Sequence, residues 1–306
     1  MRRRIGPVLT VILVVALLAS VKAWVSQELA AVSISQEIRA DEMTPLGLKL
    51  IYEGRMPREI GSVQGFAITR QYYVVAMRPP GDEAEGGETN NRLVLINRDT
   101  LADESARFAE TMTAYELGHA NGMTYNPKTN EILVVGIRAN SIHCDGIAHI
   151  RASDFAVTSV ESLPSGTASG IACMEQGYIL RSGSTIRRMS ERFQTVSEMA
   201  LFESGLEVQD IAYRNGHVYM ADWASWTRWP ALWRLRLRPD QNVIYKMQLT
   251  NGKVEAFLVK CTRRELESLC FAGQDCYLLM NGLGNDNRKF YIYRVARDAA
   301  FDALMA

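Results

Sequence analysis

The sequence lacks the short motifs that mark common classes of nucleotide-binding and hydrolytic enzymes. It has no glycine-rich phosphate loop, no G-x-S-x-G elbow and no H-E-x-x-H pair, so those chemistries are not indicated. Its cysteines (Cys144, Cys173, Cys261, Cys270 and Cys276) form no C-x-x-C pair, which argues against a zinc ribbon or a thioredoxin-type site. Net charge is also absent, because 34 Lys and Arg balance 34 Asp and Glu. This balance gives no basic footprint for nucleic acid.

Charge is missing locally as well, from a run near the N-terminus. Arginines occupy positions 2–4, and the 17 residues from Ile5 to Val21 carry no charge. A cationic end followed by a short apolar run is typical of an export signal. We predict a hydrophobic helix over residues 1–23, as either a signal peptide cleaved after Ala23 or an uncleaved membrane anchor. In both cases we expect the rest of the chain to be secreted or anchored outside the cytoplasm. Disulfides can form there. Because the number of cysteines is odd, at least one thiol is free or pairs with another molecule.

A repeated pattern runs through the rest of the chain, after a polar stretch (residues 24–46) that we interpret as a spacer. Each unit begins with a polar residue and a small residue, followed by an apolar strand, a tight turn and an aliphatic strand. The unit starts are Gln64, Asn121, Ser169, Gln209 and Glu267, separated by 57, 48, 40 and 58 positions. A third strand and a more polar fourth strand follow, the fourth lying over 106–113 in the first unit. Four antiparallel strands per repeat predict a propeller blade.

The fifth unit has no fourth strand of its own, and the segment 47–53 has no local partner. We therefore expect 47–53 to complete the last blade, because closing the ring removes exposed sheet edges. In the fourth unit the third and fourth strands are predicted over 232–239 and 244–250. Residues 47–306 are thus predicted to form one all-β domain, a β-propeller of five blades. Six blades with a degenerate unit, or a β-sandwich, are the alternatives.

The passage from Gly118 to Pro127 resembles the blade starts of secreted bacterial β-propeller proteins. The resemblance implies a fold but no single activity, because such propellers include lectins, sugar-cleaving enzymes, lactonases and scaffolds. It also implies a ligand position at the end of the central channel where the inner strands begin. The loops that join second to third strands converge at the same end.

Polar residues gather at that end of the predicted channel. The five unit starts would form a ring of ligand-binding side chains, and a second ring two residues earlier would comprise Ser62, His119, Thr167, Glu207 and Glu265. His119 is the candidate for proton transfer, with Glu207 or Glu265 as its acid–base partner. The alternative is a solvated channel whose polar groups bind backbone and ordered water.

Tryptophan is concentrated in the second-to-third-strand loop of the fourth unit. Four of the five tryptophans lie between Trp223 and Trp233. We predict that Asp222, Trp223 and Trp226 contact a ligand, since aromatic faces stack on sugar rings and on cationic groups. Trp233 is expected in the core. The alternative is that the whole loop packs against the blades.

Three functions fit these residues. The first is a binding propeller for a glycan, a peptide or a cell-envelope partner. The second is a hydrolase or lyase acting on extracellular carbohydrate through His119 with Glu207 or Glu265. The third is an envelope scaffold without a small ligand. We predict no cofactor and no metal site; calcium, or a metal held by His119, His143 and Asp145, is the alternative.

Overall fold

The structure is a computed structural model. It describes residues 38–58, 61–78, 91–109, 120–135, 146–163, 168–202, 206–224, 235–238, 241–261 and 263–306. The predicted N-terminal helix over 1–23 and the core position of Trp233 lie outside these residues. In the described ranges, no helix has the length and apolar character needed to cross a membrane. The compact unit begins at Ile38 and continues to the end of the chain.

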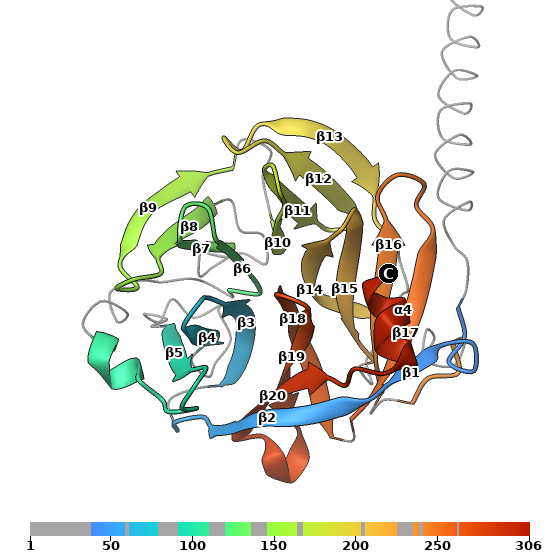
Figure 1. Ribbon diagram of the computed structural model, residues 1–306, viewed down its shortest axis with the longest axis horizontal. Helices are drawn as coiled ribbons and strands as arrows, with labels where there is room; N and C mark the ends of the chain where they lie inside the picture. The colour runs from blue at the N-terminus through green and yellow to red at the C-terminus, as the bar shows by residue number, and fades with distance from the viewer. Residues whose placement is uncertain are drawn as a thin grey trace, which may run out of the picture. The chain divides into compact units, whose positions relative to one another are not determined.

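Five sheets, antiparallel except for one added parallel strand, surround a central axis, so the predicted five-bladed propeller is confirmed (Figure 1). Blade 1 contains β3 (Ser62–Ile68), β4 (Tyr72–Arg78) and β5 (Arg92–Asn97), and blade 2 contains β6 (Gly122–Asn126), β7 (Glu131–Val135), β8 (Gly146–Arg151) and β9 (Val157–Ser162). Blade 3 contains β10 (Gly170–Cys173), β11 (Tyr178–Ser182), β12 (Thr185–Met189) and β13 (Thr195–Ala200). Blade 4 contains β14 (Glu207–Arg214), β15 (His217–Trp223), β16 (Gln241–Gln248) and β17 (Val254–Lys260), and blade 5 contains β18 (Arg264–Ala272), β19 (Asp275–Gly282) and β20 (Lys289–Val295). The inner strands β3, β6, β10, β14 and β18 contact one another around the axis.

Burial explains the pattern of each blade. The second strands are apolar on both faces because both faces pack against neighbouring blades, and six of the seven residues of β4 are buried. The outermost strands of blades 2 and 3 face solvent on most of their length, so β9 and β13 are almost wholly exposed. Each still carries an exposed valine, Val160 in β9 and Val196 in β13. The sequence of such a blade therefore shows apolar inner strands followed by an outermost strand of mixed polarity.

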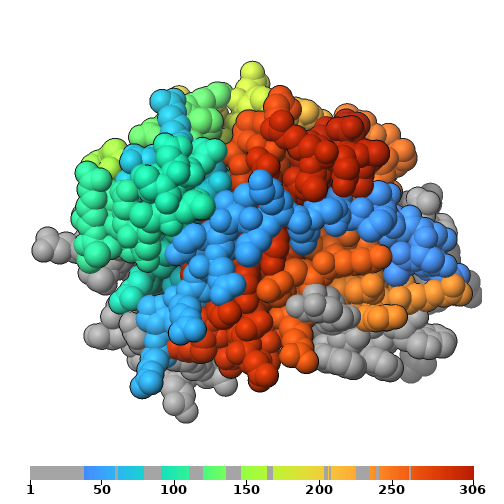
Figure 2. Space-filling model, turned by 60° about the horizontal axis from the view of Figure 1, so that its bottom comes forward, coloured from blue at the N-terminus to red at the C-terminus, as the bar shows by residue number. Residues whose placement is uncertain are grey.

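The ring closes through the N-terminal segment, as predicted. β2 (Leu48–Arg55) pairs antiparallel with β20 and becomes the fourth strand of blade 5. Figure 2 shows β2, in blue, lying across the red C-terminal strands. β1 (Thr44–Leu46) pairs parallel with β17 as a fifth strand of blade 4. The N-terminal segment thus joins blades 4 and 5 from outside.

Residues 38–46, which the sequence assigned to a spacer, belong to this packed unit. Ile38, Met43 and Leu46 are buried, and the backbone of Ala40 donates a hydrogen bond to Leu235 O at 2.8 Å. Residues 38–306 therefore contain all five blades, the closing strand and a complete core. We expect this part of the chain to fold on its own.

In blade 4 the predicted positions of the outer strands were wrong. The segment 244–250 was assigned to the fourth strand, but most of it lies in β16, which is the third. Of the segment 232–239, only 235–238 are described, and they form no strand. The true fourth strand, β17, is mostly buried because β1 covers its outer edge. A polar outermost strand was the wrong criterion for a blade that carries a fifth strand.

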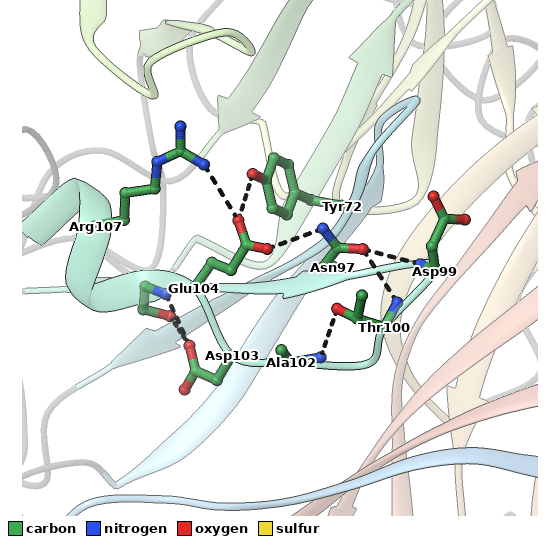
Figure 3. A network of polar contacts seen from close by, with 9 residues as sticks. Tyr72, Asn97, Asp99, Thr100, Ala102, Asp103, Glu104 and Arg107 are labelled. Atoms are coloured by element: carbon green, nitrogen blue, oxygen red, sulfur yellow. Dashed lines mark hydrogen bonds and ion pairs between the residues drawn. The ribbon is translucent and has the colours of Figure 1, made fainter.

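The fourth strand predicted over 106–113 in blade 1 was also wrong for its described residues, 106–109. A 3-10 helix (Ser105–Phe108) begins there, and residues 110–113 lie outside the described residues. Glu104 anchors this segment to the blade (Figure 3): its carboxylate accepts hydrogen bonds from Tyr72 Oη at 2.7 Å and Asn97 Nδ2 at 2.9 Å. Arg107 adds an ion pair at 3.6 Å. These side-chain bonds fix a short helix against the outer edge of β5.

A C-terminal helix covers the core between blades 4 and 5. α4 (Ala299–Met305) begins after Asp298, whose side chain caps it by accepting a hydrogen bond from Phe301 N at 3.0 Å. Tyr219 Oη donates to Leu304 O at 2.9 Å, and Lys246 Nζ donates to Ala303 O at 3.0 Å. These bonds satisfy carbonyls at the helix end that have no partner within the helix.

Candidate functional site

The five unit starts lie where the inner strands begin, at the end of the channel that we call the start mouth. In three blades the pairing register shifts directly at the unit start: at Gln64 in β3, at Gln209 in β14 and at Glu267 in β18. A β-bulge leaves its extra residue without a cross-strand partner and redirects the side chain. In blades 2 and 3, Asn121 and Ser169 directly precede β6 and β10.

The second residue of each unit sets how closely the inner strands approach. A Cβ atom added to Gly122 would lie 2.6 Å from Gly170 Cα and 2.8 Å from Ile171 N. The glycine at this position is therefore required by backbone contact between blades 2 and 3. Gly65 likewise faces the carbonyl of Ala120 in the next blade.

Blades 4 and 5 replace that glycine contact by a hydrogen bond. Ser268 Oγ donates to Asp210 Oδ2 at 2.5 Å, and Ile211 N donates to Asp210 Oδ1 at 2.7 Å. Asp210 is fully buried. Burial raises the pKa of the Asp210 carboxyl well above its ordinary value of 3.8, while these hydrogen bonds and the charge of Arg181 act in the opposite direction.

Arg181 introduces a partly buried positive charge beneath the start mouth. Its Nη1 reaches from β11 to blade 4 and donates to Val208 O at 2.9 Å, directly beside the bulged Gln209. Burial lowers the pKa of Arg181, and the carboxylates of Asp222 and Asp210 oppose that shift. The guanidinium therefore fixes the backbone of the bulge and faces two acidic side chains.

Two carboxylates of blade 5 are held by amides at the same mouth. Gln209 Nε2 donates to Glu265 Oε1 at 3.1 Å. Asn281 Nδ2 donates to Glu267 Oε1 at 2.5 Å, and Asn281 Oδ1 accepts from Val63 N of blade 1 at 3.2 Å. These contacts run from blade 4 through blade 5 to blade 1 and order the acidic side of the mouth.

Four other polar atoms of the mouth are buried and have no hydrogen-bond partner within the described part of the chain. They are Gln64 Oε1, Asn121 Oδ1, Ser169 Oγ and Trp223 Nε1. They come from blades 1, 2, 3 and 4 in turn. Buried polar atoms are nearly always hydrogen-bonded in folded proteins. Four such atoms at one mouth therefore single out this end of the channel.

Comparison with known proteins gives the fold and no family. The sequence matches no protein-family model and no curated protein. Glutaminyl cyclase from Myxococcus xanthus is similar at a TM-score of 0.50 and 10% identity, over 82% of this chain and 98% of that one. The tail fiber of Staphylococcus aureus phage P68 is similar at a TM-score of 0.55 and 13% identity, over 85% of this chain and 55% of that one. The fold is a five-bladed β-propeller. At these identities the likeness extends to the fold alone.

The remaining predicted site residues divide into two groups. His119, Thr167 and Trp226 lie outside the described residues, as do His143, Cys144 and Asp145 of the alternative metal site. Glu207 begins β14, and Asp222 and Trp223 end β15, where Glu207 and Trp223 are paired in register. Asp222 is buried and Trp223 is partly buried. The predicted proton-transfer group around His119 therefore stays a prediction.

Several residues of the mouth were missed from the sequence: Arg181, Asp210, Ser268 and Asn281. Asp210 and Ser268 stand where the first three units have glycine, and Arg181 interrupts an apolar strand, so these three carried a signal in the sequence. In the described ranges, no three His, Cys, Asp or Glu side chains are grouped so as to hold a metal. The four described cysteines are free thiols.

Proposed function

We propose that this chain is an extracytoplasmic binding propeller whose start mouth takes a neutral glycan. The observation that carries the proposal is the set of four buried polar atoms, on Gln64, Asn121, Ser169 and Trp223, that have no partner in the described ranges. The location outside the cytoplasm rests on the uncharged run behind three N-terminal arginines.

The chemistry of these atoms favours hydroxyl groups. The two amide oxygens accept hydrogen bonds, the indole N–H donates one, and the serine hydroxyl does both. A sugar hydroxyl can donate and accept at once, so it fits a mixed set of this kind. Glu265 and Glu267 lie at the same mouth and disfavour an anionic ligand. The partly buried indole of Trp223 also offers an apolar face for a sugar ring.

The test is binding of residues 38–306 to glycan and peptide arrays, followed by titration of the best ligand. Gln64→Met removes the buried carbonyl at similar size, and we expect roughly tenfold weaker binding from the lost hydrogen bond. Gln71→Met makes the same change at an exposed turn of blade 1 and should bind as the wild type does. Equal binding by the two variants contradicts the proposal. Binding to peptides alone also contradicts it, and binding to neither array indicates the scaffold.

A hydrolase or lyase is the alternative, favoured by one observation. Glu265 is a carboxylate held in place by Gln209 Nε2 at 3.1 Å at the same mouth. An oriented carboxylate is what an acid–base residue requires. Under this alternative, Glu265→Gln would abolish turnover of the bound glycan while leaving its affinity within a few fold. Unchanged turnover in that variant would exclude the role.

A further inference from the structure

A cavity lies at the other end of the channel from the start mouth, where the inner strands end; we call it the end mouth. It has a volume of about 450 Å³ and is lined by residues of all five inner strands, among them Ile68, Tyr125, Cys173, Tyr213 and Ala272. We propose that the end mouth is a separate binding site for a small carboxylate with an apolar body. This proposal does not depend on the glycan site.

The floor of the cavity is apolar. Met123, Ile211 and Leu269 line it from blades 2, 4 and 5, and each is at most 2% exposed. Met123 packs toward the start-mouth layer, because a Cβ atom added to Gly65 would lie 3.0 Å from Met123 Cβ. None of the five unit starts at the start mouth lines this cavity, so the two mouths are separate sites. A volume of this size with an apolar floor is in the range of small-molecule pockets.

The wall of the cavity contains two thiols that strengthen its apolar character. Burial raises the pKa of Cys173 to about 11, and it raises the pKa of Cys270 well above the ordinary value for a thiol. Cys270 Sγ donates to Phe66 O at 2.8 Å. Both cysteines are partly buried, and neutral thiols are poor nucleophiles that behave as small apolar groups. The site is thus suited to reversible binding of an apolar body.

The edge of the cavity, which we call the rim, carries positively charged side chains that favour an anion. Arg98 Nη1 donates to Thr69 O at 2.9 Å, which fixes its guanidinium on blade 1, and its buried Nε has no partner within the described residues. Arg70 lines the same side, is exposed, and makes no ion pair with any described residue. Two cations on one side of an apolar cavity fit a carboxylate.

On the opposite side of the rim the positive charge is already paired, and a carboxylate remains. Lys128 Nζ pairs with Glu191 at 3.2 Å and also donates to the carbonyl of Glu175. Glu175 lines the cavity on this side, and its carboxylate would repel an anion there. A bound carboxylate group would therefore lie toward Arg70 and Arg98, with its apolar body over the floor.

Titration calorimetry of residues 38–306 with 3-phenylpropionate tests the site, with 3-phenylpropylamine and 3-phenylpropanol as the cationic and neutral counterparts. We expect the carboxylate to bind and the amine to bind at least roughly tenfold more weakly, as loss of a charge-assisted hydrogen bond predicts. Bound 3-phenylpropionate should also slow alkylation of Cys173 in proportion to occupancy. No binding of the carboxylate, or equal binding of the amine, overturns the proposal.

Three variants locate the binding. Arg70→Ala should weaken 3-phenylpropionate roughly tenfold. Arg192→Ala removes an exposed arginine of blade 3 that does not line the cavity, and it should change nothing. Gln64→Met at the start mouth should also leave this affinity unchanged, so that failure of the glycan proposal and failure of this one are distinguishable. An unchanged affinity in Arg70→Ala overturns the assignment.

Discussion

The buried carboxyl of Asp210 allows a sharp test of the contact between blades 4 and 5. In Asp210→Asn the side-chain oxygen can still accept from Ile211 N, and the new amide can donate to Ser268 Oγ in place of the present 2.5 Å bond. The substitution keeps the shape and the hydrogen bonds and removes only the titratable proton. We expect it to stabilise the protein at neutral pH.

The raised pKa of Asp210 makes the stability of the wild type depend on pH. Burial raises the pKa of Asp210 in the folded protein above the ordinary 3.8, so the folded state holds its proton to higher pH than the unfolded state does. Stability of the wild type is therefore full below pH 3.8 and is lost as pH rises toward the folded pKa. The loss amounts to about 1.4 kcal/mol for each pH unit in that window. Asp210→Asn has no such loss.

Urea unfolding of residues 38–306 between pH 4 and pH 7 measures the difference. The stability of Asp210→Asn relative to the wild type should increase with pH and then level off. Asp99→Asn, in an exposed turn of blade 1, should stay within about 0.5 kcal/mol of the wild type throughout. If Asp210 is instead ionised and paired with Arg181, the variant would be about 3–5 kcal/mol less stable at pH 7, because a buried charge loses its partner. A variant that is less stable than the wild type at pH 7 would refute the reasoning.

Two further predictions concern the ring itself. Gly122→Ala forces a methyl group against the backbone of Gly170, and overpacking of this kind should lower the free energy of unfolding by about 1–3 kcal/mol, measured in urea; an unchanged midpoint would contradict the close approach. A chain that begins at residue 47 loses the buried Met43 and Leu46 and the strand β1. It should melt well below a chain that begins at residue 38, since each buried side chain contributes about 1.5–3 kcal/mol. Equal melting temperatures would restore the spacer interpretation.

The sequence was sufficient for the number of blades, their inner strand pairs and the closure, because these depend on the pattern of apolar and turn residues. Apolar strand pairs with turn residues recur every 40 to 58 positions, and the unpaired segment 47–53 matches an incomplete last blade. Such features need no knowledge of side-chain contacts. The unit starts could also be found in the sequence, because Gln64, Asn121 and Ser169 each precede a glycine.

The contacts that shape the mouth were beyond the sequence because they join distant residues. Asn281 reaches Val63 across 218 positions, and Asp210 meets Ser268 across 58. The bulges shift the register by single residues, which the alternation of apolar side chains does not reveal. Blade 4 misled the prediction for a similar reason, since β1 comes from the far end of the sequence to cover β17.

These departures from the repeat give the start mouth two unlike sides. Blades 1 to 3 contribute the neutral Gln64, Asn121 and Ser169, and glycine packing holds two of their inner strands close. Blades 4 and 5 contribute the acidic side with Glu265 and Glu267, where a hydrogen bond replaces the glycine contact. A symmetric ring would offer a ligand five equivalent orientations. Under the glycan proposal this ring would favour one orientation, because the ligand would meet uncharged polar groups on one side and carboxylates on the other.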